Sequence, residues 1–429
     1  MNITRRTAPT AGRRTGRRGV RFAAVALAGA AVVTLAPTAA VATAAGGGGS
    51  GPSAAAAAAR TDLTPALRAL VEPGGSTAAL GEVRENGRRV WRDAAGVSDL
   101  DTGRPARADG RFRIGSVTKT FVATVVLQLV DEGRLRLDDP IERHLPGVVP
   151  NGGAISVRHL LNHTSGLFNY LDDPRFLFHD EASLRAFRAE GRWTTWSPAQ
   201  LIEVGVTTAP YFAPGQGWHY SNTNYVLAGE LIRKVTGHSW QSEVERRIVR
   251  PLHLADTTFP GSRADIPGPH AHAYAQLPEG PADITQVNPT LAGAAGNGIS
   301  TTTDLTRFHE ALFGGRLLSA ARLKDMTTAV PAPTSGGTYG LGVARYELSC
   351  GEVWGHSGGF PGYSTWLLGS PDGARQFALS YTLPGPETDA SDIALDTFIE
   401  RAACGPQSAA TATATATAAG PNSPSQSPR

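Results

Sequence analysis

Apolar positions become periodic after residue 60 and predict a short helix followed by a β-hairpin. The helix is expected over 63–72, where a proline stands in the first turn. Strands are expected over 77–84 and 89–96, because Asn86-Gly87 between them is a strong signal for a tight hairpin turn. The amino-terminal part of the chain therefore contributes to a sheet.

A different pattern follows, in which apolar residues surround a helix on every side. Residues 116–131 are apolar nearly all round and the run stops at Gly133, so a centrally buried helix is expected there. The long stretch from about 135 to 330 has the character of helices and loops.

Strand patterns return near the carboxyl end, over 339–348, 353–354, 363–368 and 376–382, before a final helix over 389–403. Strands at both ends with helices between them predict an α/β fold of the α+β kind. We expect one mostly antiparallel sheet built from both termini, flanked by helices, with an all-helical subdomain beside it.

The first 45 residues have the layout of an export signal. Seven arginines and no acidic residue precede an apolar run over 22–37 and the small residues Ala40-Val41-Ala42. Because the run is short for a membrane-spanning helix, cleavage is favoured over a retained anchor. We expect a secreted mature protein without a stable membrane span; the paired arginines leave twin-arginine export open.

The rest of the chain divides by composition. A flexible linker is expected over 46–60, the catalytic domain over 61–404 and a disordered tail rich in Ala, Thr, Ser and Pro over 405–429. Outside the signal, 33 basic residues stand against 37 acidic ones, a net charge of −4. A folded surface of this sign is not expected to bind nucleic acid.

The chain has two cysteines, Cys350 and Cys404, and export would bring both into an oxidising compartment. One intramolecular disulfide is the natural interpretation, since two lone cysteines lack the paired spacing that zinc requires. Two closely spaced histidine pairs also lack an acidic third ligand: His159 with His163, and His270 with His272. No metal and no other cofactor is expected.

Lysine is rare in this chain, since only three of the 40 basic residues are lysines. A retained lysine points to chemistry that arginine cannot supply, because a buried lysine can lose its proton and act as a base. Lys119 stands three residues after Ser116 at the start of the apolar helix, so the two side chains share a face. This spacing predicts an activated serine nucleophile; a plain helix N-cap is the alternative interpretation of Ser116.

Two further short sequences complete a pattern: a Tyr-Ser-Asn sequence begins at Tyr220, and a His-Ser-Gly sequence begins at His356 on an expected strand. With RFRIGSVTKTF, HLLNHTSGL, the Tyr-Gly-Leu-Gly sequence at Tyr339 and GHSGG, about residues 62–404 resemble the penicillin-recognising serine hydrolases. That family includes D-Ala-D-Ala carboxypeptidases, class C β-lactamases and related esterases. The exported carboxypeptidases look most similar, because Tyr fills the second box and His opens the third.

The resemblance implies a role for each box. Ser116 would be the acylated nucleophile, Lys119 its base and Tyr220 a proton shuttle to the leaving amine. The oxyanion hole would come from the backbone N–H groups of Ser116 and Gly359. The expected substrate-binding residues are Asn222, which would bind the substrate amide, His356 and Ser357, which would face its carboxylate, Gly358 and Gly359.

The chain also departs from the family. Carboxypeptidases of this kind resemble one another in a basic residue soon after the Tyr-Gly-Leu-Gly strand, whereas the matching position here is Ala344, followed by Arg345. Because neighbouring strand residues point to opposite faces, Arg345 is expected to miss the site. A glycine at 359, where relatives often carry a hydroxyl, widens the cleft and suits esters or other acyl donors.

The same residues have other interpretations. GHSGG matches the nucleophile elbow of α/β-hydrolases, but that fold needs a histidine after its serine, and His356 is the last histidine here. Tyr220 and Asn222 could also be a core tyrosine and a cap, and His356 a satisfied sheet histidine. No deacylating Glu motif of a class A β-lactamase follows the second box.

The sequence thus predicts an exported serine hydrolase, first of all a D-alanyl-D-alanine carboxypeptidase acting on peptidoglycan stem peptides. An esterase or weak class C-like β-lactamase is the alternative enzyme, and an inactive penicillin-binding or sensing module is the alternative of another class. Expected partners are stem peptides or other small acyl donors, with β-lactams as covalent inhibitors. The protein is expected to be a monomer.

Overall fold

The computed structural model describes residues 62–176, 180–333 and 337–405 of the 429-residue chain. The predicted export signal, the linker over 46–60 and the tail beyond residue 405 lie outside these residues. Within the described part, no helix is long and apolar enough to cross a membrane.

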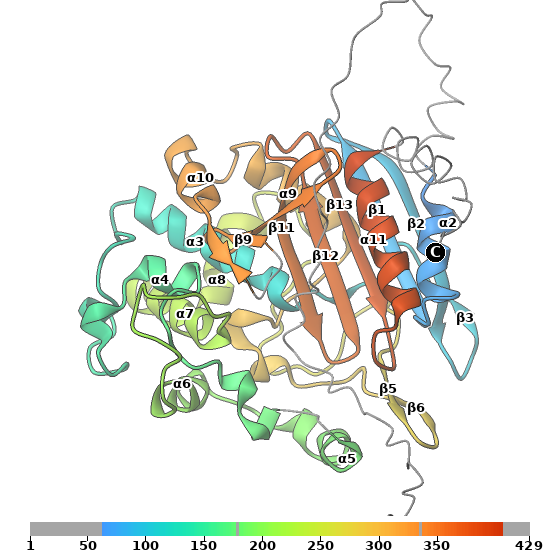
Figure 1. Cartoon of the computed structure of the whole chain (residues 1–429), viewed down its shortest axis with the longest axis horizontal. Coiled ribbons are helices and arrows are strands. Elements are labelled where there is room, and N and C mark those ends of the chain that lie inside the picture. The colour runs from blue at the N-terminus through green and yellow to red at the C-terminus, as the bar shows by residue number, and fades with distance from the viewer. Residues whose placement is uncertain (1–61, 177–179, 334–336, 406–429) are drawn as a thin grey trace, which may run out of the picture.

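A nine-stranded antiparallel sheet in the order β3-β2-β1-β13-β12-β11-β10-β9-β8 dominates the described chain (Figure 1). Segments from its two ends meet in the sheet, because β1 pairs with β13 and Ala78 lies opposite Thr382. The predicted sheet built from both termini is confirmed. Its strands are β1 (Ala78–Glu85), β2 (Arg88–Asp99), β3 (Arg104–Pro105), β8 (Val330–Ala332), β9 (Gly337–Tyr339), β10 (Ala344–Leu348), β11 (Gly351–Phe360), β12 (Tyr363–Gly369) and β13 (Arg375–Thr382).

Helices cover both faces of this sheet. On one face, α11 and α2 lie next to each other across β1, β2 and β13 (Figure 1), with Phe398 and Leu67 buried against Leu379 and Phe377 of the sheet. On the other face, α9 packs Phe308 into the larger core. The helices are α2 (Thr64–Val71), α3 (Thr118–Asp131), α4 (Val157–Leu161), α5 (Glu181–Ala189), α6 (Pro198–Thr207), α7 (Asn222–Thr236), α8 (Trp240–Val244), α9 (Thr302–Phe313), α10 (Ala320–Thr327) and α11 (Asp389–Cys404).

Short helical turns join these elements. They are η1 (Gly115–Val117), η2 (Ile141–Arg143), η3 (Gly152–Ala154), η4 (Tyr170–Asp172), η5 (Pro174–Phe176), η6 (Gly191–Trp193), η7 (Glu245–Val249), η8 (Pro289–Leu291) and η9 (Gly293–Ala295). The region predicted as helices and loops also carries a hairpin of β5 (Tyr274–Leu277) and β6 (Gly280–Asp283), so it is not entirely helical. Its strands are four residues each, too short to show a clear alternation.

The apolar helix predicted from residue 116 is α3, the central helix of the molecule. Every residue from Thr118 to Leu127 is buried, which covers all positions around the helix. The helix therefore packs on every side, as its unbroken apolar pattern predicts. Its amino end places Ser116 and Lys119 beside β11, an interior strand of the sheet.

One predicted strand is broken in the structure. The segment over 339–348 divides into β9 and β10, because Gly340 donates a hydrogen bond to the carbonyl oxygen of Val343 at 2.8 Å and closes a turn. Gly342 in that turn has a φ of 79°, a conformation that favours glycine. The turn explains why two glycines stand inside an otherwise strand-like sequence.

The structure joins Cys350 to Cys404 in a disulfide, with Cα atoms 5.3 Å apart and a sequence separation of 54. Cys350 lies in the turn between β10 and β11, and Cys404 is the last residue of α11. The bond thus ties the final helix to the hairpin that carries the third sequence box, which is the pairing expected from the sequence.

Candidate active site

Ser116 lies in the turn that leads into α3, directly against β11. It is buried, with 8% of its surface exposed. Gly115 before it has a φ of 48°, and a Cβ at that position would lie 2.4 Å from the carbonyl oxygen of Gly359. Glycine is therefore required where the serine turn and the strand touch.

Lys119 is fully buried and its amine is surrounded by three oxygen atoms. Nζ lies 3.0 Å from Oγ of Ser116, 2.7 Å from Oδ1 of Asn222 and 2.7 Å from the carbonyl oxygen of Ala295. The last two oxygens can only accept hydrogen bonds. A neutral amine would donate its two N–H bonds to them and keep its lone pair for the hydroxyl proton of Ser116.

Burial also favours the neutral amine. It lowers the pKa of Lys119 well below its ordinary value, because the charged form loses its hydration. The three groups bonded to Nζ are uncharged, so none of them offsets this effect with a negative charge. The geometry and the electrostatics both suit a general base beside Ser116.

Tyr220 lies on the other side of the serine. Its side chain forms a hydrogen bond with Ser116, and its ring centroid is 4.8 Å from Nζ of Lys119. Burial raises the pKa of Tyr220, an effect that the Ser116 hydrogen bond only partly opposes. The phenol is therefore protonated at neutral pH and placed to donate a proton to a group that leaves a carbonyl carbon under attack by Ser116.

His163, which the sequence analysis names only as one of a closely spaced histidine pair, is buried and packs against this tyrosine. The ring of His163 lies 4.3 Å from that of Tyr220, and its Nδ1 accepts a hydrogen bond from the backbone N–H of Ser221 at 3.2 Å. His159, by contrast, caps α4 together with Ser156. The two histidines of the HLLNHTSGL sequence thus act separately; in the described residues no group of His, Cys, Asp or Glu is arranged to hold a metal ion.

Asn222 begins α7 and faces Lys119 with its side-chain oxygen. Its Nδ2 lies 3.1 Å from Oδ1 of Asn169, a residue that the sequence did not identify. The amide expected to bind substrate is therefore engaged with protein groups on both sides. In the structure the side-chain oxygen of Asn222 is bonded to Nζ of Lys119, the predicted base.

The third box lies on β11, where Gly358 makes the closest approach to the serine turn. A Cβ on Gly358 would lie 2.1 Å from the carbonyl oxygen of Ile114 and 2.9 Å from the backbone nitrogen of Ser116. At Gly359 a Cβ would meet no atom within 4 Å, so this position borders open space. The backbone segments of Ser116 and Gly359, which carry the predicted oxyanion-hole donors, lie side by side.

His356 does not supply a positive charge to this cleft. Burial, with a smaller contribution from the Lys119 charge, lowers the pKa of His356 to about 3. Its Nδ1 contacts the carbonyl oxygen of Ser357, and its Nε2 lies 2.7 Å from Oη of Tyr339. The ring is neutral with both nitrogens occupied, which differs from the expectation that His356 holds a substrate carboxylate.

Arg345 does not supply this positive charge either. It forms ion pairs with Glu347 at 3.4 Å and with Glu352 at 3.3 Å. Its neighbours Ala344 and Tyr346 lie on the opposite face of β10, packed in a cluster with Tyr220. Tyr346 also forms a hydrogen bond with Ser357, so the hydroxyl predicted to face the substrate carboxylate already has a protein partner.

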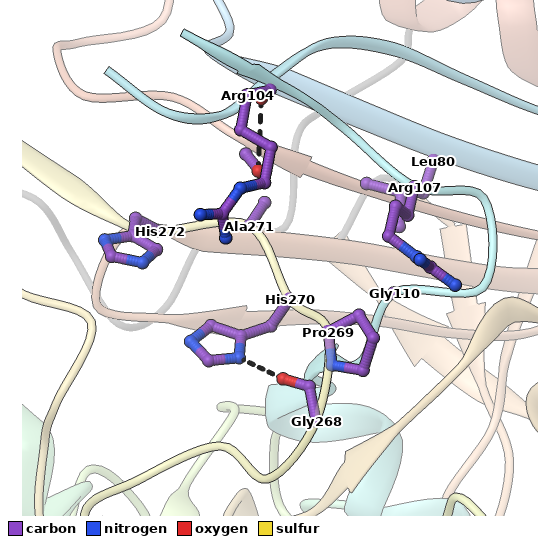
Figure 2. Close-up of a pocket in the computed structure, with 10 residues that line it drawn as sticks. Leu80, Arg104, Arg107, Gly110, Gly268, Pro269, His270, Ala271 and His272 are labelled. Atoms are coloured by element: carbon purple, nitrogen blue, oxygen red, sulfur yellow. Dashed lines mark hydrogen bonds between the residues drawn. The ribbon is translucent and has the colours of Figure 1, made fainter. Parts of the chain in front are cut away.

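A separate pocket with basic residues lies away from this site. Arg104 and Arg107 reach over the loop that carries His270 and His272 (Figure 2). Arg107 is bound to Asp109 at 2.7 Å, and His272 lies 2.8 Å from Asp283. The residues lining this pocket include none of those predicted to react, so it is not the candidate active site.

The fold and the site together define a penicillin-recognising serine hydrolase. The chain belongs to the beta-lactamase family, whose model matches residues 63–400. Penicillin-binding protein 4* of Bacillus subtilis is 30% identical over 298 residues, 66% of this chain and 63% of that protein. Esterase EstB of Burkholderia gladioli is 35% identical over 188 residues, 41% of this chain and 45% of that protein.

The chain thus spans less than two thirds of the length of these curated relatives. Two solved structures are similar over nearly their whole length. A D-stereospecific amidohydrolase from Streptomyces sp. is 42% identical with a TM-score of 0.71, covering 81% of this chain and 98% of its own. A D-amino acid amidase from Ochrobactrum anthropi SV3 is 26% identical with a TM-score of 0.69, covering 79% and 97%.

Proposed function

We propose that the protein is an exported amidohydrolase that forms an acyl-enzyme at Ser116 and acts on D-configured acyl donors with an uncharged leaving group. The observation that carries this proposal is that neither His356 nor Arg345 offers a free positive charge to a substrate carboxylate. His356 is uncharged and bound to Tyr339, and Arg345 is paired with two glutamates. Burying a substrate carboxylate there without a cation would be costly, whereas an amide or ester carries no such charge.

The similarity to the amidohydrolase and amidase structures supports the D-configured acyl group and the amide bond. The likeness to penicillin-binding protein 4* supports a second candidate, the D-alanyl-D-alanine carboxypeptidase predicted from the sequence. The two candidates share the acyl-enzyme and differ in the charge of the leaving group. Secretion, with the disulfide formed after export, belongs to both proposals.

The chemistry follows from the three reacting side chains. Lys119 accepts the proton of Ser116 as Oγ attacks the carbonyl carbon, and the N–H groups of Ser116 and Gly359 bind the oxyanion, an interaction commonly worth about 3 kcal/mol per donor. Tyr220 gives its proton to the nitrogen as the amide bond breaks, and the Lys119 ammonium returns a proton to Tyr220. Water then attacks the ester, and Ser116 recovers its hydrogen.

The proposal is tested by a matched pair of substrates. Diacetyl-Lys-D-Ala-D-Ala and the same peptide with a carboxamide end differ only in the terminal charge. We expect a higher kcat/KM for the carboxamide, and hydrolysis of D-phenylalanine amide with ammonia release but not of its L isomer. A clear preference for the free carboxylate would overturn the proposal in favour of the carboxypeptidase, and equal rates for the two isomers would remove the D-configured donor.

A further inference from the structure

A continuous chain of hydrogen bonds runs from the amine of Lys119 to the carboxylate of Asp172. Nζ of Lys119 is 2.7 Å from Oδ1 of Asn222, whose Nδ2 is 3.1 Å from Oδ1 of Asn169. Nδ2 of Asn169 is in turn 2.9 Å from Oδ1 of Asp172. Lys119 and both asparagines are at most 2% exposed, whereas Asp172, in η4, is only half-buried.

Both ends of this chain fix the direction of its hydrogen bonds. A carboxylate only accepts, so Asn169 must turn its amide nitrogen to Asp172 and its oxygen to Asn222. The backbone N–H of Asn222 donates to that same oxygen at 3.0 Å, which requires the same orientation. Asn222 then faces Asn169 with its nitrogen and Lys119 with its oxygen.

We propose that Asn169 and Asp172 are positioning residues that tune the base Lys119 through Asn222. The carboxylate polarises two amides in series, and hydrogen bonds in such a chain strengthen one another in a low-dielectric interior. Oδ1 of Asn222 becomes a better acceptor for the ammonium that forms when Lys119 takes the serine proton. The inference rests on Lys119 as the base and not on the identity of the acyl donor.

The other titratable groups around Lys119 do not supply this negative charge. The rings of Tyr220 and Tyr225 lie 4.8 Å and 5.5 Å from Nζ, and burial raises the pKa of both. Burial, followed by the charge of Lys119, lowers the pKa of His163 and of His356. All four are uncharged near neutral pH. The relay formed by Asn222, Asn169 and Asp172 therefore connects Lys119 to a negative charge that its direct neighbours do not carry.

The first test removes the charge at the end of the relay. Asp172→Asn keeps the size of the side chain, and Asp173→Asn is the matched control, because Asp173 is bound to Arg175 at 2.8 Å and lies outside the relay. The readout is the pH dependence of kcat/KM for an uncharged p-nitrophenyl ester, which is independent of the proposed amide substrates. Both variants are first checked for an unchanged thermal unfolding temperature.

In Asp172→Asn we expect the acidic limb to move to lower pH, since a weaker acceptor stabilises the ammonium less. The plateau rate should fall roughly tenfold, in line with the loss of one charge-assisted hydrogen bond. Asp173→Asn should stay within about twofold of the unmodified enzyme. Identical pH profiles of Asp172→Asn and Asp173→Asn would overturn the proposal. They would show that the hydrogen bond between Asn169 and Asp172 has no effect beyond that of a nearby charge.

A second test moves the charge closer to the base. In Asn169→Asp combined with Asp172→Asn, every donor still faces an acceptor, and the carboxylate stands one step nearer Lys119. The acidic limb should move to higher pH than in the unmodified enzyme, while Asn169→Asp alone, with two carboxylates face to face, should be less active than the double variant. A shift of the double variant in the same direction as Asp172→Asn would overturn the relay.

Discussion

The hydroxyl of Tyr339 is hydrogen-bonded to the ring of His356, with Oη 2.7 Å from Nε2. Nδ1 of the same ring contacts the carbonyl oxygen of Ser357, the next residue of the strand. Since Nδ1 faces a carbonyl oxygen, it carries the ring hydrogen, and Nε2 accepts the Tyr339 hydroxyl. Protonating His356 would break this arrangement, in agreement with a pKa of about 3 that burial causes. The His-Ser-Gly sequence that begins at His356 is therefore uncharged near neutral pH.

The first prediction concerns substrate charge and pH. Because His356 does not titrate near neutrality, the ratio of KM values for the free-carboxylate peptide and its carboxamide should be constant between about pH 6 and pH 8. Steady-state kinetics with the two peptides measures this ratio directly. A ratio that climbs with pH would mean that His356 is charged at the lower pH and binds the carboxylate.

The second prediction concerns the nucleophile. Ser116→Ala should abolish covalent labelling by a fluorescent penicillin and reduce turnover by several orders of magnitude, because it removes the hydroxyl that lies 3.0 Å from Nζ of Lys119. Ser357→Ala is the matched control, since Ser357 lies in the elbow-like GHSGG sequence, and it should still be labelled. Labelling that survives in Ser116→Ala but not in Ser357→Ala would reverse the assignment.

The third prediction concerns the base. Lys119→Arg keeps a cation but cannot offer a lone pair, so acylation should fall at least about a hundredfold at neutral pH. Lys324→Arg, on the exposed part of α10, makes the same exchange away from the site and should leave the rate unchanged. The rate of p-nitrophenyl ester hydrolysis gives both values. Comparable activity of the two variants would show that Lys119 is not the proton acceptor.

The fourth prediction concerns acid stability. Burial lowers the pKa of His309 from its ordinary value of 6.5 to about 4, against the smaller opposing effect of its hydrogen bond to the Trp354 carbonyl. Between about pH 6.5 and pH 4 the unfolded chain therefore binds a proton that the folded chain does not. The stability contributed by the neutral ring is present above this window and is lost as the pH falls through it.

His309→Gln removes this titration and keeps a donor for the Trp354 carbonyl, which Nε2 of His309 contacts at 2.8 Å. We expect the unfolding temperature of the variant to fall less steeply with decreasing pH than that of the unmodified protein. Calorimetry at a series of pH values checks this. Parallel curves would show that His309 does not contribute to acid unfolding.

The fifth prediction concerns the disulfide. A bond that closes a loop of 54 residues should stabilise the folded chain by up to about 4 kcal/mol in the loop-entropy model. Cys404→Ser, or reduction of the unmodified protein, should lower the unfolding temperature, and reduction should have no further effect on Cys404→Ser. Two reactive thiols in the denatured, unreduced protein would contradict the bond.

Elements with a long, unambiguous pattern could be predicted from the sequence. The apolar run of α3 admits only a buried helix, and Asn86-Gly87 sets the turn of the first hairpin, where the structure has Asn86 with a φ of 50°. Ser116 and Lys119 follow from the same helix, because their contact needs only the spacing of three residues on one face. Local order was therefore enough to predict the contact between Ser116 and Lys119.

Contacts between distant segments could not be predicted in the same way. Asn169 reaches Asn222 across 53 positions, and His163 reaches Ser221 across 58. Nothing in the local pattern of Asn169 distinguishes a buried relay from a loop asparagine. The neutral state of His356 depends on its burial and on its contact with Tyr339, which the turn at Gly340 brings close to it, and the residues next to His356 in sequence do not indicate that contact.

The pairing of β1 with β13 also determines when the sheet can be completed during synthesis. Ala78 is bonded to Thr382 across 304 positions, so β1 has no strand on the side away from β2 until almost the whole domain has been synthesised. Ser116 and Lys119 emerge early, but the strand that carries Gly358 and closes against them arrives near the end. A chain broken off before β11 would keep Ser116 and Lys119 but lack Gly359, one of the two predicted oxyanion-hole donors.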